Sequence, residues 1–437
     1  MKATWRALLA TSLLIAPAAL ATKVPIPVEG ASLNVSVQVQ TEAMVTENGA
    51  PNGTDPAYDI FVRRTRILVN GDISQNFTYL IQVDNANFGK FGNFTGRAIV
   101  QDAWVGWAPF GQTGGTVLYV DAGLLLIPIS RHLLTSTTNF ITADVHTDEF
   151  RFPGNGFPAL RDTGVQLRGW LADKKVGFRG GVYEGYTPIL QSTTTSCITA
   201  TANSCITPKR NPQVAGFINF DLIGSEEGGW LYGDYKWGKD PVLTIGLSGV
   251  YQSLAIRNTT TGVGTATNPN ITDQKLASAD VYLNLPQTEN AELVISAVGY
   301  LNGYGDGNAN TGKGFFADVG YRFGPVAPYA SFSYFQADDC PTLTVAANAA
   351  ACAASIQTAN SRNWKAGLNF FFNKNLNHLN LEFQINHGLS GYGPQAITTG
   401  NAGYAPLLAG GGAGGAQNTN LRVSAQKSFL AHWNVLF

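Results

Sequence analysis

The end of the chain alternates strictly between apolar and polar positions. Its odd-numbered residues are Leu421, Val423, Ala425, Lys427, Phe429, Ala431, Trp433, Val435 and Phe437, and the other face begins with Arg422, Ser424, Gln426 and Ser428. Alternation with period two is typical of a β-strand whose two faces meet different surroundings. The sequence therefore predicts one long strand at 420–437 that ends on an aromatic residue.

The same period-two pattern recurs along the whole chain. It predicts strands at 32–45, 58–71, 75–86, 97–108, 116–127, 163–172, 175–186, 213–223, 242–256, 276–286, 291–302, 314–323, 327–337, 361–372 and 378–388, besides the last one. Glycine, tyrosine and phenylalanine are abundant and methionine is nearly absent, which favours glycine-punctuated strands over a helical core. We therefore expect an all-β protein with sixteen strands.

The connections between these strands alternate between short and long. The short ones are 72–74, 109–115, 173–174, 286–290, 324–326 and 373–377, and the long ones are 45–57, 87–96, 128–162, 187–212, 257–275, 303–313, 338–360 and 389–419. This layout predicts an antiparallel transmembrane β-barrel with short periplasmic turns and long extracellular loops. The segment 224–241 could be an additional short strand, but we interpret it as an elaborate turn.

Alternation alone does not separate a barrel in lipid from a soluble sandwich. Aromatic residues near strand ends favour the barrel, because interfacial girdles need them. They are Trp104, Trp107, Tyr119, Trp170, Tyr183, Tyr186, Tyr321, Phe323, Trp364, Trp433 and Phe437. Lipid offers no partner to an open strand edge, so the sheet must close. The terminal Phe437 is similar to the assembly signal of outer-membrane barrels.

The N-terminus reads as a secretory signal peptide. Lys2 and Arg6 precede an apolar run, and small residues end at Ala21, so we expect residues 1–21 to be removed and 22–437 to form the barrel. No later stretch reaches 18 uninterrupted apolar residues, which excludes a transmembrane helix. These features predict a protein of the bacterial outer membrane that contacts lipid. The formal net charge of −1 gives no reason to expect a nucleic-acid partner.

Four cysteines suit the oxidising compartment that export implies. Cys197 lies near Cys205, and Cys340 lies near Cys352, each pair within a stretch that has weak strand patterning. We interpret the two pairs as disulfides that close local loops. Neither pair has a second ligand pair nearby, so a zinc site is not expected.

Several stretches resemble the phosphate-selective porin O/P family, in the same order and spacing. They are RRTRILVNGDISQNFTYLIQVDNANFG, DAWVGW, GLLLIPISRHLLTSTTNFITADV, LRDTGVQLRGWLADKKVGFRGGVYEGY and PVLTIGLSGVYQ. The resemblance implies a homotrimeric, sixteen-stranded outer-membrane channel whose third long loop, here 128–162, folds into the lumen. Phosphate-selective members line the channel with arginine and lysine. This chain has Leu126 where family members often have a lysine, so we expect only a mild anion preference.

Period-two faces also predict which charges line the lumen. The expected wall residues are Arg64, Arg66, Arg168, Lys175, Arg179, Arg322, Lys365 and Arg422, with Asp84, Asp102, Asp221, Asp280, Asp318 and Glu382. We expect Arg131, Arg151 and Arg161 of the third loop to face Arg66 and Arg168 across a constriction, where charge rings select ions. The alternative is that arginines and carboxylates pair and only stiffen the wall.

The third loop also carries His132, Asp144, His146, Asp148, Glu149 and Asp162. Carboxylates and imidazoles bind metals, but alternating polar residues are common in loops, so no metal or cofactor is expected. The five histidines show no nucleophile signature, and we expect no enzyme activity. The predicted function is a passive porin for small hydrophilic solutes with a mild preference for anions such as phosphate. The alternative is a barrel with a plugged or narrow pore, whose long extracellular loops bind partners or surfaces.

Overall fold

A computed structural model of the chain describes residues 22–24, 26, 28–50, 54–96, 98–147, 149–151, 160–186, 211–226, 230–238, 240–258, 270–342, 345–387 and 426–437. The predicted signal peptide at 1–21 lies outside the described residues. So do Cys197, Cys205, Asp148 and Arg422.

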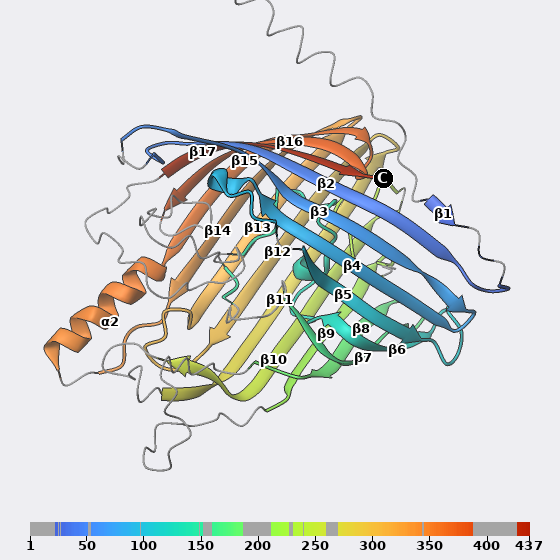
Figure 1. Cartoon of the computed structure of the whole chain (residues 1–437), viewed down its shortest axis with the longest axis horizontal. Helices are drawn as coiled ribbons and strands as arrows, with labels where there is room; N and C mark the ends of the chain where they lie inside the picture. The colour runs from blue at the N-terminus through green and yellow to red at the C-terminus, as the bar shows by residue number, and fades with distance from the viewer. Residues whose placement is uncertain are drawn as a thin grey trace, which may run out of the picture.

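Sixteen long antiparallel strands form one closed barrel, as predicted (Figure 1). They are β2 Leu33–Thr46, β3 Ala57–Ser74, β4 Phe77–Phe88, β5 Ala98–Trp107, β6 Val117–Leu126, β7 Arg161–Leu171, β8 Val176–Tyr183, β9 Gln213–Ile223, β10 Val242–Asn258, β11 Asn270–Thr288, β12 Ala291–Gly303, β13 Gly312–Phe323, β14 Val326–Ala337, β15 Ser361–Asn373, β16 Asn377–His387 and β17 Gln426–Leu436. Strand β9 pairs directly with β10, which confirms that 224–241 is an elaborate turn.

The barrel closes where the last strand pairs with the first long one. Strand β17 pairs with β2 from Ser428 to Leu436, and the three-residue strand β1, Thr22–Val24, pairs with the part of β2 that β17 leaves uncovered. The backbone N–H of Phe437 donates to the carbonyl oxygen of Val37 at 2.8 Å. The hydrogen-bond ladder therefore runs to the last residue, whose side chain is exposed on the outer face.

The short turns and the long loops lie at opposite ends of the barrel. In Figure 1 the C-terminus and the β3–β4 turn are at one end, and helix α2, Ala346–Ala359, projects from the other. In barrels of this kind the short turns face the periplasm. Two 3₁₀ turns, η1 Lys90–Gly92 and η2 His132–Leu134, complete the elements. In the described part of the chain, no helix has the length and apolar character needed to cross a membrane.

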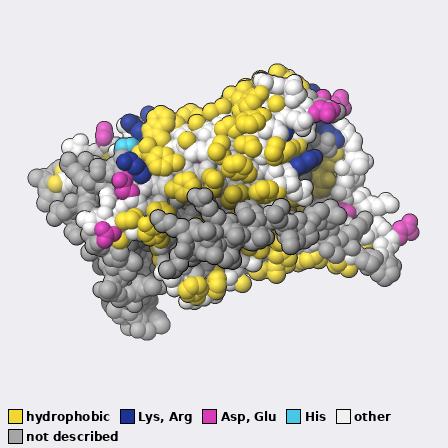
Figure 2. Space-filling view, turned by 90° about the horizontal axis from the view of Figure 1, so that it is seen from above, with side chains coloured by type: hydrophobic (Ala, Val, Ile, Leu, Met, Phe, Trp, Pro, Cys, Tyr) yellow, Lys and Arg dark blue, Asp and Glu magenta, His cyan; other side chains and the backbone are white. Residues whose placement is uncertain are grey.

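The outer face of the strands is apolar and the inner face is largely polar. Ile67, Ile81 and Val105 are exposed on the outside, whereas Gln40 and Asn434 are buried on the inside. Figure 2 shows hydrophobic side chains over the middle of the barrel, with charged side chains near its two ends. This apolar band is the surface that lipid requires of a spanning barrel.

The prediction that strand-end aromatics form an outer girdle is only partly correct. Trp107, Phe323, Trp364 and Phe437 are exposed on the outside. Five others are buried in the interior instead: Trp104, Tyr119, Trp170, Tyr183 and Tyr186. Trp104, for example, is two residues from the inward-facing Asp102, so both side chains lie on the same face of β5. A position near a strand end sets the height of a side chain, but not the face on which it lies.

Candidate pore constriction

The third long loop, residues 127–160 between β6 and β7, crosses the interior of the barrel. Gln40 of β2 donates to the backbone oxygen of Thr137 at 2.9 Å, and the backbone N–H of Ala143 donates to Glu382 of β16 at 3.2 Å. Farther along the loop, the backbone N–H of Arg151 donates to Asn302 of β12 at 3.3 Å. The loop is thus held on two parts of the wall: β2 and β16, which are separated only by β17, and the more distant β12.

A second segment enters the lumen from the turn end. It is the 224–241 connection between β9 and β10, which we call the inner insert. The backbone N–H of Tyr232 donates to the oxygen of Leu134 at 2.8 Å, and the backbone N–H of Ser136 donates to the oxygen of Tyr232 at 3.0 Å. Asn139 of the loop also exchanges hydrogen bonds with the backbone of Tyr235. Loop and insert therefore form one hydrogen-bonded layer inside the barrel.

Arg131 joins these two segments through a buried ion pair. Its Nε and Nη2 atoms donate to Glu226 at 2.7 and 2.5 Å, and its Nη1 atom donates to Asp234 at 2.9 Å. The guanidinium also lies 3.4 Å from the ring centroid of Tyr282. Burial by itself lowers the pKa of Arg131, but Glu226 and Asp234 outweigh burial and hold that pKa well above its usual range. Arg131 is only 1% exposed, so the structure does not bring it to an open pore surface.

An apolar cluster packs beneath this layer. Inward-facing residues of β9 to β13 meet apolar residues of the loop and the insert, among them Leu134, Phe150, Phe217, Tyr232, Tyr300 and Phe316. The inner face of the sheet is therefore not wholly polar, because on this side apolar residues of the strands pack against the loop and the insert. The loop supplies the partners that let Phe217 and Phe316 face inward without contacting water.

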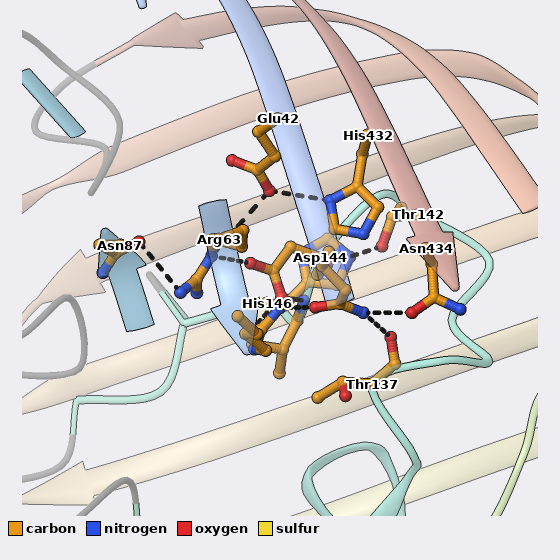
Figure 3. A network of polar contacts seen from close by, with 12 residues as sticks. Glu42, Arg63, Asn87, Thr137, Thr142, Asp144, His146, His432 and Asn434 are labelled. Carbon is orange, nitrogen blue, oxygen red and sulfur yellow. Dashed lines mark hydrogen bonds and ion pairs between the residues drawn. The ribbon is translucent and has the colours of Figure 1, made fainter. Parts of the chain in front are cut away.

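Two consecutive arginines of β3 clamp the loop from the other side, and Figure 3 shows one of them, Arg63, beside Asp144. Arg63 Nε donates to Asp144 Oδ2 at 2.8 Å, and Arg64 Nη2 donates to Asp144 Oδ1 at 2.7 Å. Neighbouring residues of a strand normally face opposite ways, but here Gln40 pairs with Arg64 and Thr41 with Val62, so Arg63 is the extra residue of a β-bulge. The bulge turns Arg63 inward, and this residue was missed because the period-two pattern places it outside.

The clamp extends to the seam where the barrel closes. Arg63 also donates to Asn87 at 3.2 Å, and Glu42 of β2 contacts Arg63 at 3.9 Å and His432 of β17 at 2.9 Å (Figure 3). Burial raises the pKa of Asp144, but the two arginines outweigh burial and bring that pKa well below its ordinary value. Asp144 is therefore held as a carboxylate.

Two histidines of the loop lie against β13. His146 Nε2 is 2.9 Å from Asp318 Oδ1, and the backbone N–H of His146 donates to Nε2 of His132 at 3.0 Å. Burial lowers the pKa of His132 well below its usual value, and His146 lowers it further. Within the described ranges, no group of three or more histidine, cysteine or acidic residues is arranged to hold a metal ion.

Three of the arginines predicted for the constriction lie on the wall in ion pairs. Arg66 Nε donates to Asp84 at 3.0 Å, and its Nη1 atom donates to the loop residue Thr137 at 2.7 Å. Arg161 donates to Asp102 at 3.2 and 3.1 Å. Arg168 donates to Asp121 at 2.8 and 3.2 Å. The alternative that arginines pair with carboxylates thus describes these three contacts well.

Arg151 lies away from the others, at the base of helix α2. Its Nη2 atom donates to the backbone oxygen of Ala359 at 3.0 Å, in the last turn of the helix, and its guanidinium lies 4.5 Å from the ring centroid of Phe335. A cation there satisfies a carbonyl that the helix leaves unpaired. A disulfide between Cys340 and Cys352 joins this helix to the end of β14.

The remaining predicted wall residues occupy varied environments. Arg322 donates to Glu292 at 2.6 Å, Arg179 donates to the backbone oxygen of Trp230 at 2.5 Å, and Lys365 is partly buried on β15. Lys175 contacts the backbone of Gly224 at the turn end. Asp221, Asp280 and Asp318 are buried. The list of predicted wall residues contains more bases than acids, but buried carboxylates outnumber buried arginines and lysines among the described residues.

The five predicted constriction residues therefore do not form a single ring. They bind the inner layer or the wall at separate places, and the described hydrogen bonds of their guanidinium groups go to carboxylates, a hydroxyl or backbone carbonyls, while Arg131 and Arg151 also contact aromatic rings. Glu226, Asp234 and Arg63 are the residues that sequence reasoning missed. The acidic pair in SEEGG and the aromatic spacing of 230–237 were signals that this elaborate turn folds into the lumen.

No protein-family model and no curated protein matches this chain. Solved structures show the same fold. An anion-selective porin from Comamonas acidovorans is 13% identical, and the alignment covers 93% of this chain and 100% of that one, with a TM-score of 0.52. The high-pH structure of OprB from Pseudomonas putida is 8% identical, with coverage of 93% and 94% and a TM-score of 0.52.

These identities show the fold alone. The closed sixteen-stranded barrel with its apolar outer band nevertheless identifies the chain as a bacterial outer-membrane protein, because closed barrels of exported chains span that membrane.

Proposed function

We propose that the protein is an outer-membrane porin, a passive channel for small hydrophilic solutes that is narrowed by the third loop and the inner insert. The observation that carries this proposal is the hydrogen bonding of the third loop to two separate parts of the wall, at Gln40 and Glu382 near the closing seam and at Asn302 on β12. A loop tethered at several heights narrows a barrel of this size, and polar walls beside it offer solutes a path.

We further propose a mild preference for anions along the wall from β3 to β8. Arg64, Arg66, Arg161, Arg168 and Arg179 all lie in that sector. The paired N–H donors of an arginine guanidinium bind phosphate and carboxylate oxygens well, and a wall of low dielectric constant strengthens the electric field of the arginine charges. The buried carboxylates elsewhere oppose this preference, which is why we propose a mild one. We also propose membership of the phosphate-selective porin O/P family on the stretches that resemble it, assembly as a homotrimer as that resemblance implies, and removal of residues 1–21 on the signal-peptide pattern.

Current recordings and reversal potentials in planar bilayers under a KCl gradient test both the channel function and the anion preference. We expect sustained open-channel current and a reversal potential shifted toward that of chloride. Arg66→Gln should reduce the shift, because it removes a charge from the proposed path. Arg362→Gln, an exposed outward-facing arginine, is the matched control and should leave the shift unchanged. A cation preference in the unmodified protein would remove the anion proposal and leave the channel.

The packed interior favours one alternative, a barrel whose lumen is closed at rest and whose loops bind a partner. Gln40, Asn380 and Asn434 face inward and are almost completely buried. Purified, folded protein that remains electrically silent over long recordings would support this alternative. Sustained current through the folded protein would exclude it.

A further inference from the structure

The third loop lies against strand β13 at a glycine that leaves room for its backbone. A Cβ atom added at Gly314 would overlap the backbone oxygen of Glu149. Asn302 of β12 holds the same part of the loop, because it accepts from the backbone N–H of Arg151 at 3.3 Å and donates to the backbone oxygen of Glu149 at 3.4 Å. We call residues 149–151 the distal limb of the loop. A single methyl group at position 314 should therefore displace this limb from the wall.

The side chain of Arg151 joins the distal limb to helix α2, at the loop end of the barrel (Figure 1). Its Nη2 atom donates to the carbonyl oxygen of Ala359 at 3.0 Å, and its guanidinium lies 4.5 Å from the ring centroid of Phe335. Carbonyls in the last turn of a helix lack a partner within the helix, and the helix dipole favours a cation there. The position of the limb therefore depends on where α2 ends.

A disulfide and a small apolar cluster fix α2 to the end of β14. Cys340, just after β14, is bonded to Cys352 of the helix, and Cys352 is fully buried. Phe335 and Ile356 belong to the same buried cluster as Cys352. Because Phe335 also contacts the Arg151 guanidinium, the cluster supports the side chain that reaches the loop.

The disulfide contributes much of what holds the helix in place. Among the described side chains of α2, two are buried, Cys352 and Ile356, so apolar packing alone fixes the helix weakly. The disulfide closes a loop with a sequence separation of 12 and restricts the other positions open to the helix. Cys340 is partly exposed, so a small thiol can reach the bond from outside the barrel. Opening the bond should let α2 move and break the hydrogen bond from Arg151.

We propose that α2 supports the third loop from outside the barrel through Arg151, and that a dithiol releases the distal limb by reducing the Cys340–Cys352 disulfide. In this step the bond between the two sulfurs breaks, the dithiol supplies two electrons and two protons, and it becomes a disulfide itself. Arg151 is thus a positioning residue for the constriction. The expected effect on current rests on the proposed channel function, whereas the effect on the loop does not.

Hydrogen exchange of the folded, full-length protein in detergent tests the effect on the loop, because an amide exchanges faster when the structure around it opens more readily. Loss of the charged hydrogen bond should speed exchange in the distal limb about tenfold or more. Dithiothreitol should cause this change in the unmodified protein and in the control Cys197→Ser/Cys205→Ser, which retains the Cys340–Cys352 disulfide. Cys340→Ser/Cys352→Ser should exchange fast without reductant and change no further with it.

Arg151→Met separates the support of the loop from the stability of the helix, since it keeps an unbranched side chain but has no donor. Its distal limb should exchange fast with or without reductant, while α2 itself stays protected until the disulfide is reduced. Faster exchange in α2 alone when the unmodified protein is reduced would overturn the proposal. So would a response to dithiothreitol that disappears in Cys197→Ser/Cys205→Ser.

A methyl group at the glycine tests the effect on current. Gly314→Ala should displace the distal limb and raise open-channel noise, as reduction should in the unmodified protein. Gly299→Ala on the neighbouring strand β12 is the matched control, because nothing lies within 4 Å of its Cβ position, and it should leave the noise unchanged. Heat-modifiable gel mobility verifies that each variant is folded.

The two measurements distinguish the support of the loop from the channel function. A silent barrel whose distal limb still exchanges faster after reduction would support the role of α2 and reject the channel. Sustained current with the same noise before and after reduction would show that the limb does not shape the solute path, and would overturn the proposal. Equal noise in Gly314→Ala and Gly299→Ala would overturn it as well.

Discussion

Arg131 and Glu226 form a bidentate ion pair in the barrel interior, with N–O distances of 2.7 and 2.5 Å and side-chain exposures of 2% and 0%. Arg131 belongs to the loop that enters from one end of the barrel, and Glu226 belongs to the insert that enters from the other. The pair thus connects two segments that have no covalent link within the lumen. Their pairing holds the loop and the insert together as the layer that fills part of the lumen.

Breaking this pair should destabilise the inner layer strongly. Glu226→Gln leaves the buried Arg131 with Asp234 as its remaining counter-charge, so we expect the loss of a charged hydrogen-bonding partner, about 1.5 to 3 kcal/mol. Urea unfolding followed by tryptophan fluorescence measures the change in the free energy of unfolding. The control is Glu47→Gln, because Glu47 and Lys427 form an exposed pair at 3.8 Å that contributes less than about 1 kcal/mol. Equal effects of the two variants would contradict the proposed connection.

Removing the charge of Asp144 should lower the free energy of unfolding more than removing the charge of Arg63 or Arg64 alone. Asp144→Asn leaves Arg63 and Arg64 buried without their shared counter-charge, whereas Arg63→Gln leaves Asp144 paired with Arg64. We expect Asp144→Asn to lower the free energy of unfolding by about 3 kcal/mol or more, and Arg63→Gln to lower it less.

Single-channel recordings give a second measurement of this clamp, because a released loop should increase open-channel noise. Asp240→Asn, at an exposed turn position, should change neither quantity. A noisier channel in Arg63→Gln than in Asp144→Asn would reverse the predicted order and contradict the mechanism.

Charges placed on the two faces of one strand should have different effects. Val83→Lys and Leu283→Lys put a charge in the lipid-facing band, which costs about 2 to 4 kcal/mol near the middle of the bilayer. Gln82→Lys and Asn284→Lys put it in the interior, where we expect mainly altered conductance. Folding into vesicles at graded urea concentrations measures the loss of stability, and bilayer recordings measure the change in conductance. A similar response from both pairs would show that the faces are assigned wrongly.

Acid should weaken the inner layer through His132. The folded state holds this imidazole neutral, with a pKa well below the usual 6.5, because burial disfavours its charge. The unfolded chain therefore binds more protons as the pH falls below 6.5, and unfolding becomes easier by up to about 1.4 kcal/mol per pH unit. The stabilisation is complete above pH 6.5 and declines below it.

His132→Gln provides the comparison for this pH effect, because it retains an acceptor for the His146 backbone N–H but does not titrate. Between pH 7.5 and 5.5, the free energy of unfolding of the unmodified protein should fall by about 1.4 kcal/mol more than that of the variant. Parallel pH profiles of the two proteins would exclude His132 as the titrating group.

The sequence predicted the barrel well and its interior poorly. Strand number and the facing of residues such as Gln82 and Val83 follow from period-two alternation, which is a local property. The same rule failed at Arg63, because a bulge inserts one residue and reverses the alternation that follows. It also failed for the aromatic residues, because Trp104 and Tyr119 find apolar partners inside that no local pattern reveals.

The sequence by itself determined the closed sheet, its short and long connections and its apolar outer surface. These features follow from the alternation of apolar and polar residues and from turn-forming segments, which are patterns of residues close together in the sequence. Only the tertiary structure decided which charges meet inside. Arg131 and Glu226 are 95 residues apart, and Arg63 and Asp144 are 81 residues apart. Their pairing depends on barrel closure, strand register and the paths of two inserted segments together, so it exists only once the whole barrel has formed.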